Sequence, residues 1–274
     1  MKEGPKKFLK NLVPPAVLRA ARGAAGGPYG FFGDYKSWAD ALCDSKGYAD
    51  PDIVGKVLAA TMKVENGEAA YERDSVLFDA PQYSWPVLAA LLWAASVNGN
   101  RLFVMDFGGS LGSSYRQNRY FLSHVDPLTW NVVEQAGCVE AGKRHFEDER
   151  LRFYPSIADC LADNTPDVAL LSSVVQYLPE PHALLDDIVR RGFRTIIVDR
   201  TPLVEGVRDR LTVQKVPPSI YDASYPAWFL ERGRFLSHFR DGYEPAAEFD
   251  ALAGEIDLGD VKARDKGFIF RKRS

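Results

Sequence analysis

Five short apolar runs between residues 102 and 199 constrain the fold of this chain more than any other feature. They span residues 102–106, 131–134, 151–154, 168–171 and 195–199. Helical stretches separate most of them, and one of these, residues 182–191, ends at Gly192. Short runs that are apolar throughout and alternate with helices are typical of parallel strands covered by helices on both faces. The sequence therefore predicts an α/β fold built on a mainly parallel sheet.

The last apolar run, residues 267–270, has no helix after it. Parallel strands need a long crossover, so a final strand without one is expected to pair antiparallel with a neighbour. Residues 243–249 are the expected neighbour. We expect the sheet domain to span residues 100–274.

The segment before the sheet, residues 30–97, has a mostly helical pattern. We expect one helix that starts near Ser37, a second over residues 51–65, and a third that runs from Ser84 to residue 97. The segment has no glycine-rich phosphate loop and no clustered histidines. We interpret residues 28–99 as a helical N-terminal cap on the sheet domain.

The first 27 residues form a basic tail that Gly26, Gly27 and Pro28 separate from the rest. Six lysines and arginines in the tail outnumber its single acid, Glu3. Two interpretations stay open: weak contact with an anionic membrane surface, or a tail that is solvated or packed on a partner. The longest apolar run, residues 86–97, is too short to span a bilayer, and no signal peptide is evident. We expect a cytoplasmic protein, with peripheral contact at the inner membrane face as the open alternative.

Composition narrows the classes of partner. Thirty-four Lys and Arg against thirty-seven Asp and Glu give a net charge of −3. Dedicated duplex-binding domains are usually basic, so we expect no nucleic-acid partner. The three cysteines are far apart and form no Cys-x-x-Cys pair, which argues against a disulfide framework or a zinc knuckle. We expect isolated core cysteines, as in a reducing cytosol.

The turn after the first strand carries the strongest chemical signal. Asp106 is followed by Gly108, Gly109, Ser110 and Gly112. In an open parallel sheet, ligands bind at the carboxyl ends of the strands, where a glycine-rich turn lets the backbone approach them closely. The alternative is a tight turn that serves only packing.

An acid, Glu134, ends the second strand, twenty-two residues beyond Gly112. A carboxylate in this place accepts hydrogen bonds from a ribose diol. Together with Asp106 it leaves two carboxylates near the ligand. That arrangement suits a cationic amino-acid nucleotide better than a pyrophosphate.

The chain here resembles class I S-adenosylmethionine-dependent methyltransferases, whose first motif is an acid followed by a Gly-x-Gly-x-Gly turn. Asp106, Gly108 and Gly112 match this motif, and Ser110 stands at the middle glycine. Residues 172–181 are similar to the family's segment after the fourth strand. The resemblance implies a Rossmann-like, mainly parallel seven-stranded sheet with an antiparallel C-terminal strand. It also implies S-adenosylmethionine as the cofactor.

A narrower similarity spans nearly the whole chain. The segments that carry it are residues 31–38, 71–75, 133–135, 199–202 and 220–226. They look like segments of a family of bacterial proteins assigned as methyltransferases and often encoded among surface-polysaccharide genes. The similarity implies methyl transfer. Our hypothesis is that the acceptor is a small molecule or is linked to a glycan, with a role in surface-polysaccharide biosynthesis.

Polar residues after the fourth and fifth strands are the candidates for contact with the cofactor and for catalysis. Ser173, Gln176 and Tyr177 follow the fourth strand, and we expect them to reach the cofactor or the acceptor. Asp199 and Arg200 follow the fifth strand. Two hypotheses stay open for Asp199: it takes a proton from a hydroxyl acceptor, or it holds Arg200 in a salt bridge. Positioning of the acceptor supplies much of the acceleration in either case.

Four further residues are candidates for contact with the substrate. Arg73, beside Asp74, is either a lid contact or half of a buried ion pair. Tyr221, Tyr225 and Trp228 come after the fifth strand and either stack on a sugar or pack together.

No metal site is expected. The four histidines have no ligand spacing. Catechol-type methyltransferases place a metal-binding acid after the fourth strand, where this chain has Ser172 and Ser173.

Two other functions stay open on the sequence alone. A nicotinamide-dependent sugar-modifying oxidoreductase fits the sheet pattern, although the turn lacks Gly-x-Gly-x-x-Gly and no tyrosine has a lysine four residues later. A non-catalytic cofactor-binding scaffold fits Ser110 in the turn and the absence of an obvious base.

Overall fold

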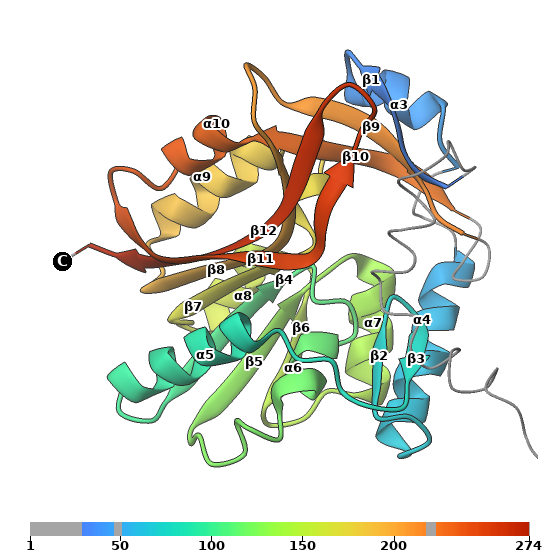
Figure 1. The fold of residues 1–274 in the computed structure, drawn as a ribbon. Coiled ribbons are helices and arrows are strands. Elements are labelled where there is room, and N and C mark those ends of the chain that lie inside the picture. Colours follow the sequence, from blue (N-terminus) through green and yellow to red (C-terminus); the bar gives the residue numbers. More distant parts are fainter. Residues whose placement is uncertain (1–28, 47–50, 218–222, 274) are drawn as a thin grey trace, which may run out of the picture.

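The computed structural model describes residues 29–46, 51–217 and 223–273 (Figure 1). The basic tail, residues 1–27, lies outside the described residues, and with it the expected membrane contact. No described helix combines the length and the apolar character needed to cross a membrane.

Five parallel strands form the centre of the sheet. In spatial order they are β6 (Leu151–Tyr154), β5 (Leu128–Val133), β4 (Leu102–Phe107), β7 (Val168–Ser172) and β8 (Thr195–Val204). Counted along the chain, these are the third, second, first, fourth and fifth strands of the domain, which is a Rossmann-like order. Most of their side chains are buried on both faces, which explains why the runs are apolar throughout. The predicted α/β fold is confirmed.

Two C-terminal strands complete the seven that were predicted. They are β11 (Tyr243–Asp257) and β12 (Lys262–Lys272). β12 pairs antiparallel with β8, and β11 pairs antiparallel with β12. Phe268 and Phe270, from the last apolar run, are buried in the core. The predicted antiparallel C-terminal strand is therefore confirmed.

Three further strands extend the sheet beyond the prediction to ten strands. β10 (Ser224–Glu231) joins β8 only through Leu230 and Glu231. β9 (Arg210–Lys215) pairs antiparallel with β10, and β1 (Gly30–Tyr35) pairs antiparallel with β9. β1 lies in the segment that was expected to be mostly helical. It is a strand because β9, far later in the chain, supplies its hydrogen bonds, and such pairing leaves little local signal in the sequence.

The three helices expected before the sheet are present. α3 (Trp38–Cys43) is capped by Ser37, whose Oγ accepts the Asp40 backbone N–H at 3.2 Å. α4 spans Pro51–Glu65, and α5 (Trp85–Val97) begins directly after Ser84. Between α4 and α5 lies a two-stranded hairpin that the sequence did not predict, formed by β2 (Tyr71–Arg73) and β3 (Val76–Phe78).

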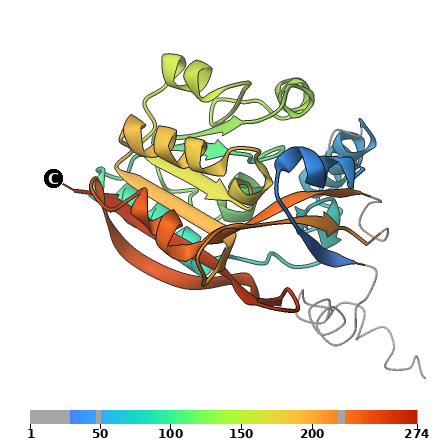
Figure 2. The ribbon, with the colours of Figure 1, turned by 90° about the horizontal axis from the view of Figure 1, so that it is seen from above.

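Helices cover both faces of the sheet (Figures 1 and 2). The later ones are α6 (Ser113–Asn118), α7 (Ala136–His145), α8 (Ile157–Asp163), η1 (Val175–Tyr177), α9 (Pro181–Arg191) and α10 (Arg232–Ser237). The largely apolar α5 packs on one face with Val104 and Leu170 of the central strands. α8 and α9 pack on the other face with Met105 and Leu171. Because neighbouring side chains of a strand point to opposite faces, the core is divided into two layers.

The cysteines fit the expectation of core positions only in part. Cys160 is buried and Cys138 is half-buried, but Cys43 is exposed. The prediction is wrong for Cys43 because the inward face of α3 buries only Ala41.

A bulge interrupts β8 where it reaches the carboxyl edge of the parallel strands. The register with β12 shifts there, so that Gly267 alone stands opposite Asp199 and Arg200. Arg200 has a left-handed backbone conformation, with φ of +52°. A bulge bends the strand and redirects the side chains of the bulged residues. The bulge therefore decides where the Arg200 guanidinium points.

Replacement of Gly267 by alanine tests the packing around this bulge. A Cβ at Gly267 would lie 2.1 Å from the Phe249 ring, so the ring or the strand must move. We expect Gly267→Ala to lower the free energy of unfolding by about 1–3 kcal/mol, the usual cost of overpacking. As a control, Gly206→Ala, where a Cβ meets nothing within 4 Å, should change it by less than about 0.5 kcal/mol. Urea unfolding measures both, and equal stabilities of the two variants would contradict the described packing.

Candidate functional site

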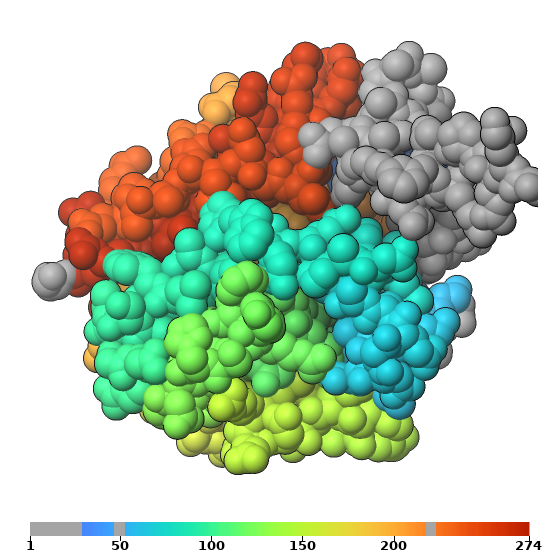
Figure 3. All heavy atoms as spheres, turned by 60° about the horizontal axis from the view of Figure 1, so that its bottom comes forward, coloured from blue at the N-terminus to red at the C-terminus, as the bar shows by residue number. Residues whose placement is uncertain are grey.

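A cavity of about 550 Å³ opens at the carboxyl ends of β4, β5, β7 and β8. The hairpin β2–β3, the starts of α5 and α6, and the middle of β11 form further parts of its wall. Residues of α4, β9 and β10 also line it. On the outside, the teal segment near residue 85 lies next to the orange-red C-terminal hairpin (Figure 3). The strand order reverses between β4 and β7, which is where Rossmann-like sheets bind their ligands.

The glycine-rich turn after β4 forms the floor of the cavity. Gly108, Gly109 and Ser110 line it, whereas Gly112 lies just outside and precedes α6 with φ of +88°. Ser110 has φ of +54°, so it adopts the left-handed conformation that glycine favours. A Cβ at Gly108 would lie 2.3 Å from Val174, so this glycine is needed for packing as well.

Asp106 lies beneath the turn and does not line the cavity. Its side chain is buried and accepts a hydrogen bond from Trp130 Nε1 at 2.9 Å. A Cβ at Gly109 would lie 2.5 Å from the Asp106 carboxylate, so the carboxylate fills the space under that residue. Burial raises the pKa of Asp106 to about 7. The structure therefore places Asp106 as a support of the turn.

The Glu134 carboxylate lines the cavity at the end of β5. Its Oε1 accepts the Ser110 backbone N–H at 3.3 Å, and its Oε2 accepts the Gln135 backbone N–H at 2.7 Å. Burial raises the pKa of Glu134, and the two backbone donors oppose this shift. The carboxylate is thus held beside the turn, where it can accept further hydrogen bonds from a ligand.

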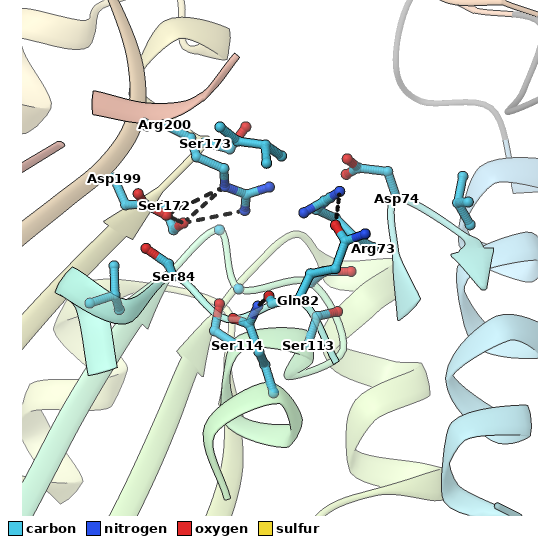
Figure 4. A pocket seen from close by; sticks show the side chains of 18 of the residues that line it. Arg73, Asp74, Gln82, Ser84, Ser113, Ser114, Ser172, Ser173, Asp199 and Arg200 are labelled. Carbon is cyan, nitrogen blue, oxygen red and sulfur yellow. Dashed lines mark hydrogen bonds and ion pairs between the residues drawn. The ribbon is translucent and has the colours of Figure 1, made fainter. Parts of the chain in front are cut away.

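Ser172, Asp199 and Arg200 form a hydrogen-bonded cluster at the end of β7 and the bulge of β8 (Figure 4). Ser172 Oγ donates to Asp199 Oδ2 at 2.9 Å and accepts from Arg200 Nε at 3.3 Å and Nη2 at 3.2 Å. Arg200 Nε also lies 3.5 Å from Asp199 Oδ2. Of the two hypotheses for Asp199, the salt bridge with Arg200 is present in the structure.

Of the two cofactor candidates that follow β7, Ser173 and Gln176, only Ser173 lines the cavity. Ser173 lines the cavity and has φ of +57°. Gln176 is buried behind the cavity wall, where its Nε2 donates to the Arg200 carbonyl oxygen at 3.1 Å and to Ser173 Oγ at 3.3 Å. Gln176 therefore holds the backbone carbonyl of Arg200 and the side-chain hydroxyl of Ser173, two residues that face the cavity.

On the opposite wall, Arg73 and Asp74 both line the cavity. Arg73 Nη2 donates to Gln82 Oε1 at 3.1 Å, and its guanidinium lies 5.2 Å from the centre of the Phe78 ring. Among the described residues Arg73 forms no ion pair with Asp74. Its placement therefore matches the lid contact and not the buried ion pair.

The aromatic candidates separate into two groups. Tyr177 and Tyr225 line the cavity with their rings edge to face at 5.2 Å, and Tyr177 Oη donates to Gln214 Oε1 at 2.8 Å. Trp228 lies outside the cavity wall, where it stacks on Trp38 and donates from Nε1 to the Leu178 carbonyl oxygen at 3.1 Å. For Trp228, the structure therefore agrees with packing and not with stacking on a sugar. Tyr221 lies outside the described residues.

Several polar residues of the wall were not among the sequence candidates. They are Gln82, Ser84, Ser113, Ser114, Gln117 and Gln214. Ser113 and Gln117 had a signal in the sequence, because they directly follow the glycine turn and lie four residues apart on one face of a helix. Gln82, Ser84 and Gln214 reach the cavity only through long-range packing.

Backbone strain is concentrated at the cavity. Four non-glycine residues of its wall have positive φ, namely Asp74 (+52°), Ser110 (+54°), Ser173 (+57°) and Arg200 (+52°). Each such conformation costs on the order of 1 kcal/mol and persists where surrounding contacts enforce it. Strained residues of this kind cluster at ligand sites, which agrees with the position of the cavity.

Metal ligands do not gather at this site or elsewhere in the described residues. No three His, Cys, Asp or Glu side chains among them are placed to hold one ion.

No protein-family model and no curated protein matches the chain. Among solved structures, the N-terminal domain of EvdMO1, determined with SAH (S-adenosylhomocysteine) and D-fucose, shares 13% identity over 74% of this chain and 90% of that one, with a TM-score of 0.47. Magnesium protoporphyrin IX methyltransferase from Synechocystis PCC 6803 with bound SAM (S-adenosylmethionine) shares 14% over 84% and 100%, with a TM-score of 0.43. Human N-acetylserotonin methyltransferase with SAM shares 16% over 68% and 52%, with a TM-score of 0.39. At TM-scores this low we base no conclusion on these similarities, and the fold assignment rests on the strand order.

The buried Asp106 predicts a specific dependence of stability on pH. Because its pKa is raised from 3.8 to about 7, the folded protein keeps a proton that the unfolded chain releases between these values. This residue therefore makes stability fall as the pH rises from about 4 to about 7, with no further change above. In the variant Asp106→Asn, the asparagine side chain has the same shape as the aspartate side chain but does not titrate. Relative to wild type, its free energy of unfolding should rise across that window by at most about 4 kcal/mol. Urea unfolding from pH 4 to 8 measures the difference, and a flat difference would contradict the described burial.

Proposed function

We propose that this protein transfers a methyl group from S-adenosylmethionine to a small-molecule or glycan-linked acceptor. One observation carries the proposal. The backbone N–H of Ser110, in the glycine turn, lies 3.3 Å from the Glu134 carboxylate, and both line a cavity at the carboxyl edge of the sheet. This is the pair of elements that the sequence motif assigns to an adenosyl ligand.

The turn can approach such a ligand with its backbone alone. At Gly108 and Gly109 the positions that a Cβ would occupy are already filled, by Val174 and by the Asp106 carboxylate. The surface that these residues present to the cavity is therefore backbone. Glu134 beside them is suited to the two hydroxyls of a ribose, since a carboxylate accepts hydrogen bonds from both.

When bound there, S-adenosylmethionine supplies an electrophilic methyl group on a sulfonium cation. The residues of the wall then have to position the acceptor, which supplies much of the acceleration in an in-line transfer. Tyr225, Phe249 and Leu252 line the cavity and limit the access of water. The Glu134 carboxylate has no cationic partner among the described residues, so its charge favours a cationic ligand at that end of the cavity.

The three catalytic candidates divide between two roles in this proposal. Asp199 accepts from Ser172 and pairs with Arg200, so we assign it to positioning of the Arg200 side chain. Arg200 and Tyr177 face the cavity, and we assign them to contact with the acceptor. A role of Asp199 as general base would require it to give up these partners.

The finer parts of the proposal follow from the sequence and from the resemblance given above. They are the glycan-linked acceptor, the role in surface-polysaccharide biosynthesis and the cytoplasmic location. A nicotinamide dinucleotide is less favoured, because the turn lacks the Gly-x-Gly-x-x-Gly pattern and no tyrosine has a lysine four residues later.

Isothermal calorimetry with S-adenosylmethionine and with SAH tests the proposal. We expect both to bind the wild-type protein. Glu134→Gln keeps one acceptor for the Ser110 N–H but loses the charge and one acceptor, so its dissociation constant should rise about tenfold. The control Glu140→Gln, at an exposed position of α7, should bind as wild type does.

Absence of binding by the wild type at millimolar cofactor would overturn the proposal. Equal affinities of Glu134→Gln and the wild type would overturn the assignment of Glu134 to the ribose. Tight binding without methyl transfer across a broad acceptor screen would favour the non-catalytic scaffold.

A further inference from the structure

Two guanidinium groups point into the same cavity from opposite walls. Arg200 comes from the bulge of β8, and Arg73 comes from the end of β2. Figure 4 shows the two side chains directed toward each other across the cavity. Burial lowers the pKa of Arg73, and the positive charge of Arg200 adds to this effect. Two cations that face each other in this way create a site for an anion.

Each guanidinium is anchored from behind and keeps donors for a ligand. Arg200 bonds to Ser172 through Nε and Nη2, and Arg73 bonds to Gln82 through Nη2. Among the described residues, Nη1 of either arginine has no hydrogen-bond partner. Because arginine carries five N–H donors in a planar fork, these anchors orient the groups without exhausting them.

Among the described residues, no carboxylate forms an ion pair with both arginines. Asp199 lies beside Arg200 and accepts the Ser172 hydroxyl. Burial lowers the pKa of Arg200, but the charges of Asp199 and Asp74 raise it, and the charge of Asp74 also acts on Arg73. Asp74 forms no ion pair with either arginine in the described part of the chain. The edges of the guanidinium groups that face the cavity therefore remain open to an incoming oxyanion.

Arg200 lies far from the end of the cavity that we assign to the ribose. Glu134 follows β5 and Arg200 lies in β8, and β4 and β7 separate these two strands. Three strand spacings amount to about 14 Å, which is more than one ribose can bridge. If the adenosyl part lies at Glu134, Arg200 is at the opposite end of these four strands, where we place the acceptor.

We propose that the acceptor carries an oxyanion, either a carboxylate or a phosphate, and that Arg73 and Arg200 bind it together. This inference rests on the proposed function, because it takes Glu134 as the place of the cofactor. Guanidinium groups bind both oxyanions through paired, charge-assisted hydrogen bonds. Recognition by two arginines from separate elements would hold the acceptor in one orientation.

Titration of small anions into protein saturated with SAH tests the inference. The probes are inorganic phosphate and acetate, followed by calorimetry. We expect at least one of them to bind while SAH is present, and the tighter of the two indicates the type of oxyanion on the acceptor. Arg73→Gln and Arg200→Gln should each weaken this binding about tenfold. The control Arg190→Gln, at an exposed position of α9, should leave it unchanged.

Saturation with SAH also shows whether the arginines bind the oxyanion of an acceptor or the carboxylate of the cofactor itself. If the anions bind only without SAH, or if Arg200→Gln weakens SAH as much as the anion, the arginines serve the cofactor and the inference is overturned. The same conclusion follows if neither anion binds, or if both arginine variants bind anions as wild type does. Failure of SAH to bind at all would instead overturn the proposed function.

A crystal of the wild-type protein grown with SAH and soaked in phosphate provides a second measurement that needs no variant. We expect density for the anion between the two guanidinium groups. Bound SAH with no anion there would overturn the inference even if the arginine variants failed to fold.

Discussion

Four parallel strands that end at one edge of a sheet determine where the polar groups of this protein's cavity lie. Hydrogen-bonded strands are about 4.8 Å apart, so the residues that follow them appear in the order of the strands. That order is Glu134 after β5, the glycine turn after β4, Ser173 after β7 and Arg200 in β8. In the proposed function, the ribose binds at the Glu134 end of this order and the acceptor at the Arg200 end, and the backbone sets the spacing between them.

The groups that line the cavity are supported by a layer of buried polar residues. Asp106 lies under the glycine turn, and Gln176 holds the Arg200 carbonyl and the Ser173 hydroxyl. The bulge of β8 depends in turn on Gly267, against which the Phe249 ring packs. These contacts hold Ser173 and Arg200 in left-handed conformations that an isolated chain would seldom adopt. The cost in stability is small, and the result is a set of fixed directions for side chains and backbone donors.

The parts of the fold and site that could be predicted from sequence are those with local causes. Ser37 and Ser84 precede helices, and the strand-end acids Asp106 and Glu134 lie on neighbouring strands because the Rossmann-like order requires it. The pairing of β1 with β9 could not be predicted, since its partners are distant in the chain. The same holds for the approach of Arg73 to Arg200, which depends on a hairpin that no local pattern indicated. Residue type alone also did not show which polar and aromatic candidates line the cavity. Tyr177 and Tyr225 line it, whereas Gln176 and Trp228 are packed behind its wall.

A crystal structure of the protein grown with SAH tests the central claim most directly. We predict that the adenosyl group lies over the Gly108–Ser110 turn, with both ribose hydroxyls within hydrogen-bond distance of the Glu134 carboxylate. A cavity that stays empty at saturating SAH, or a ribose bound away from Glu134, would contradict the claim. Only the description of the fold would then remain supported.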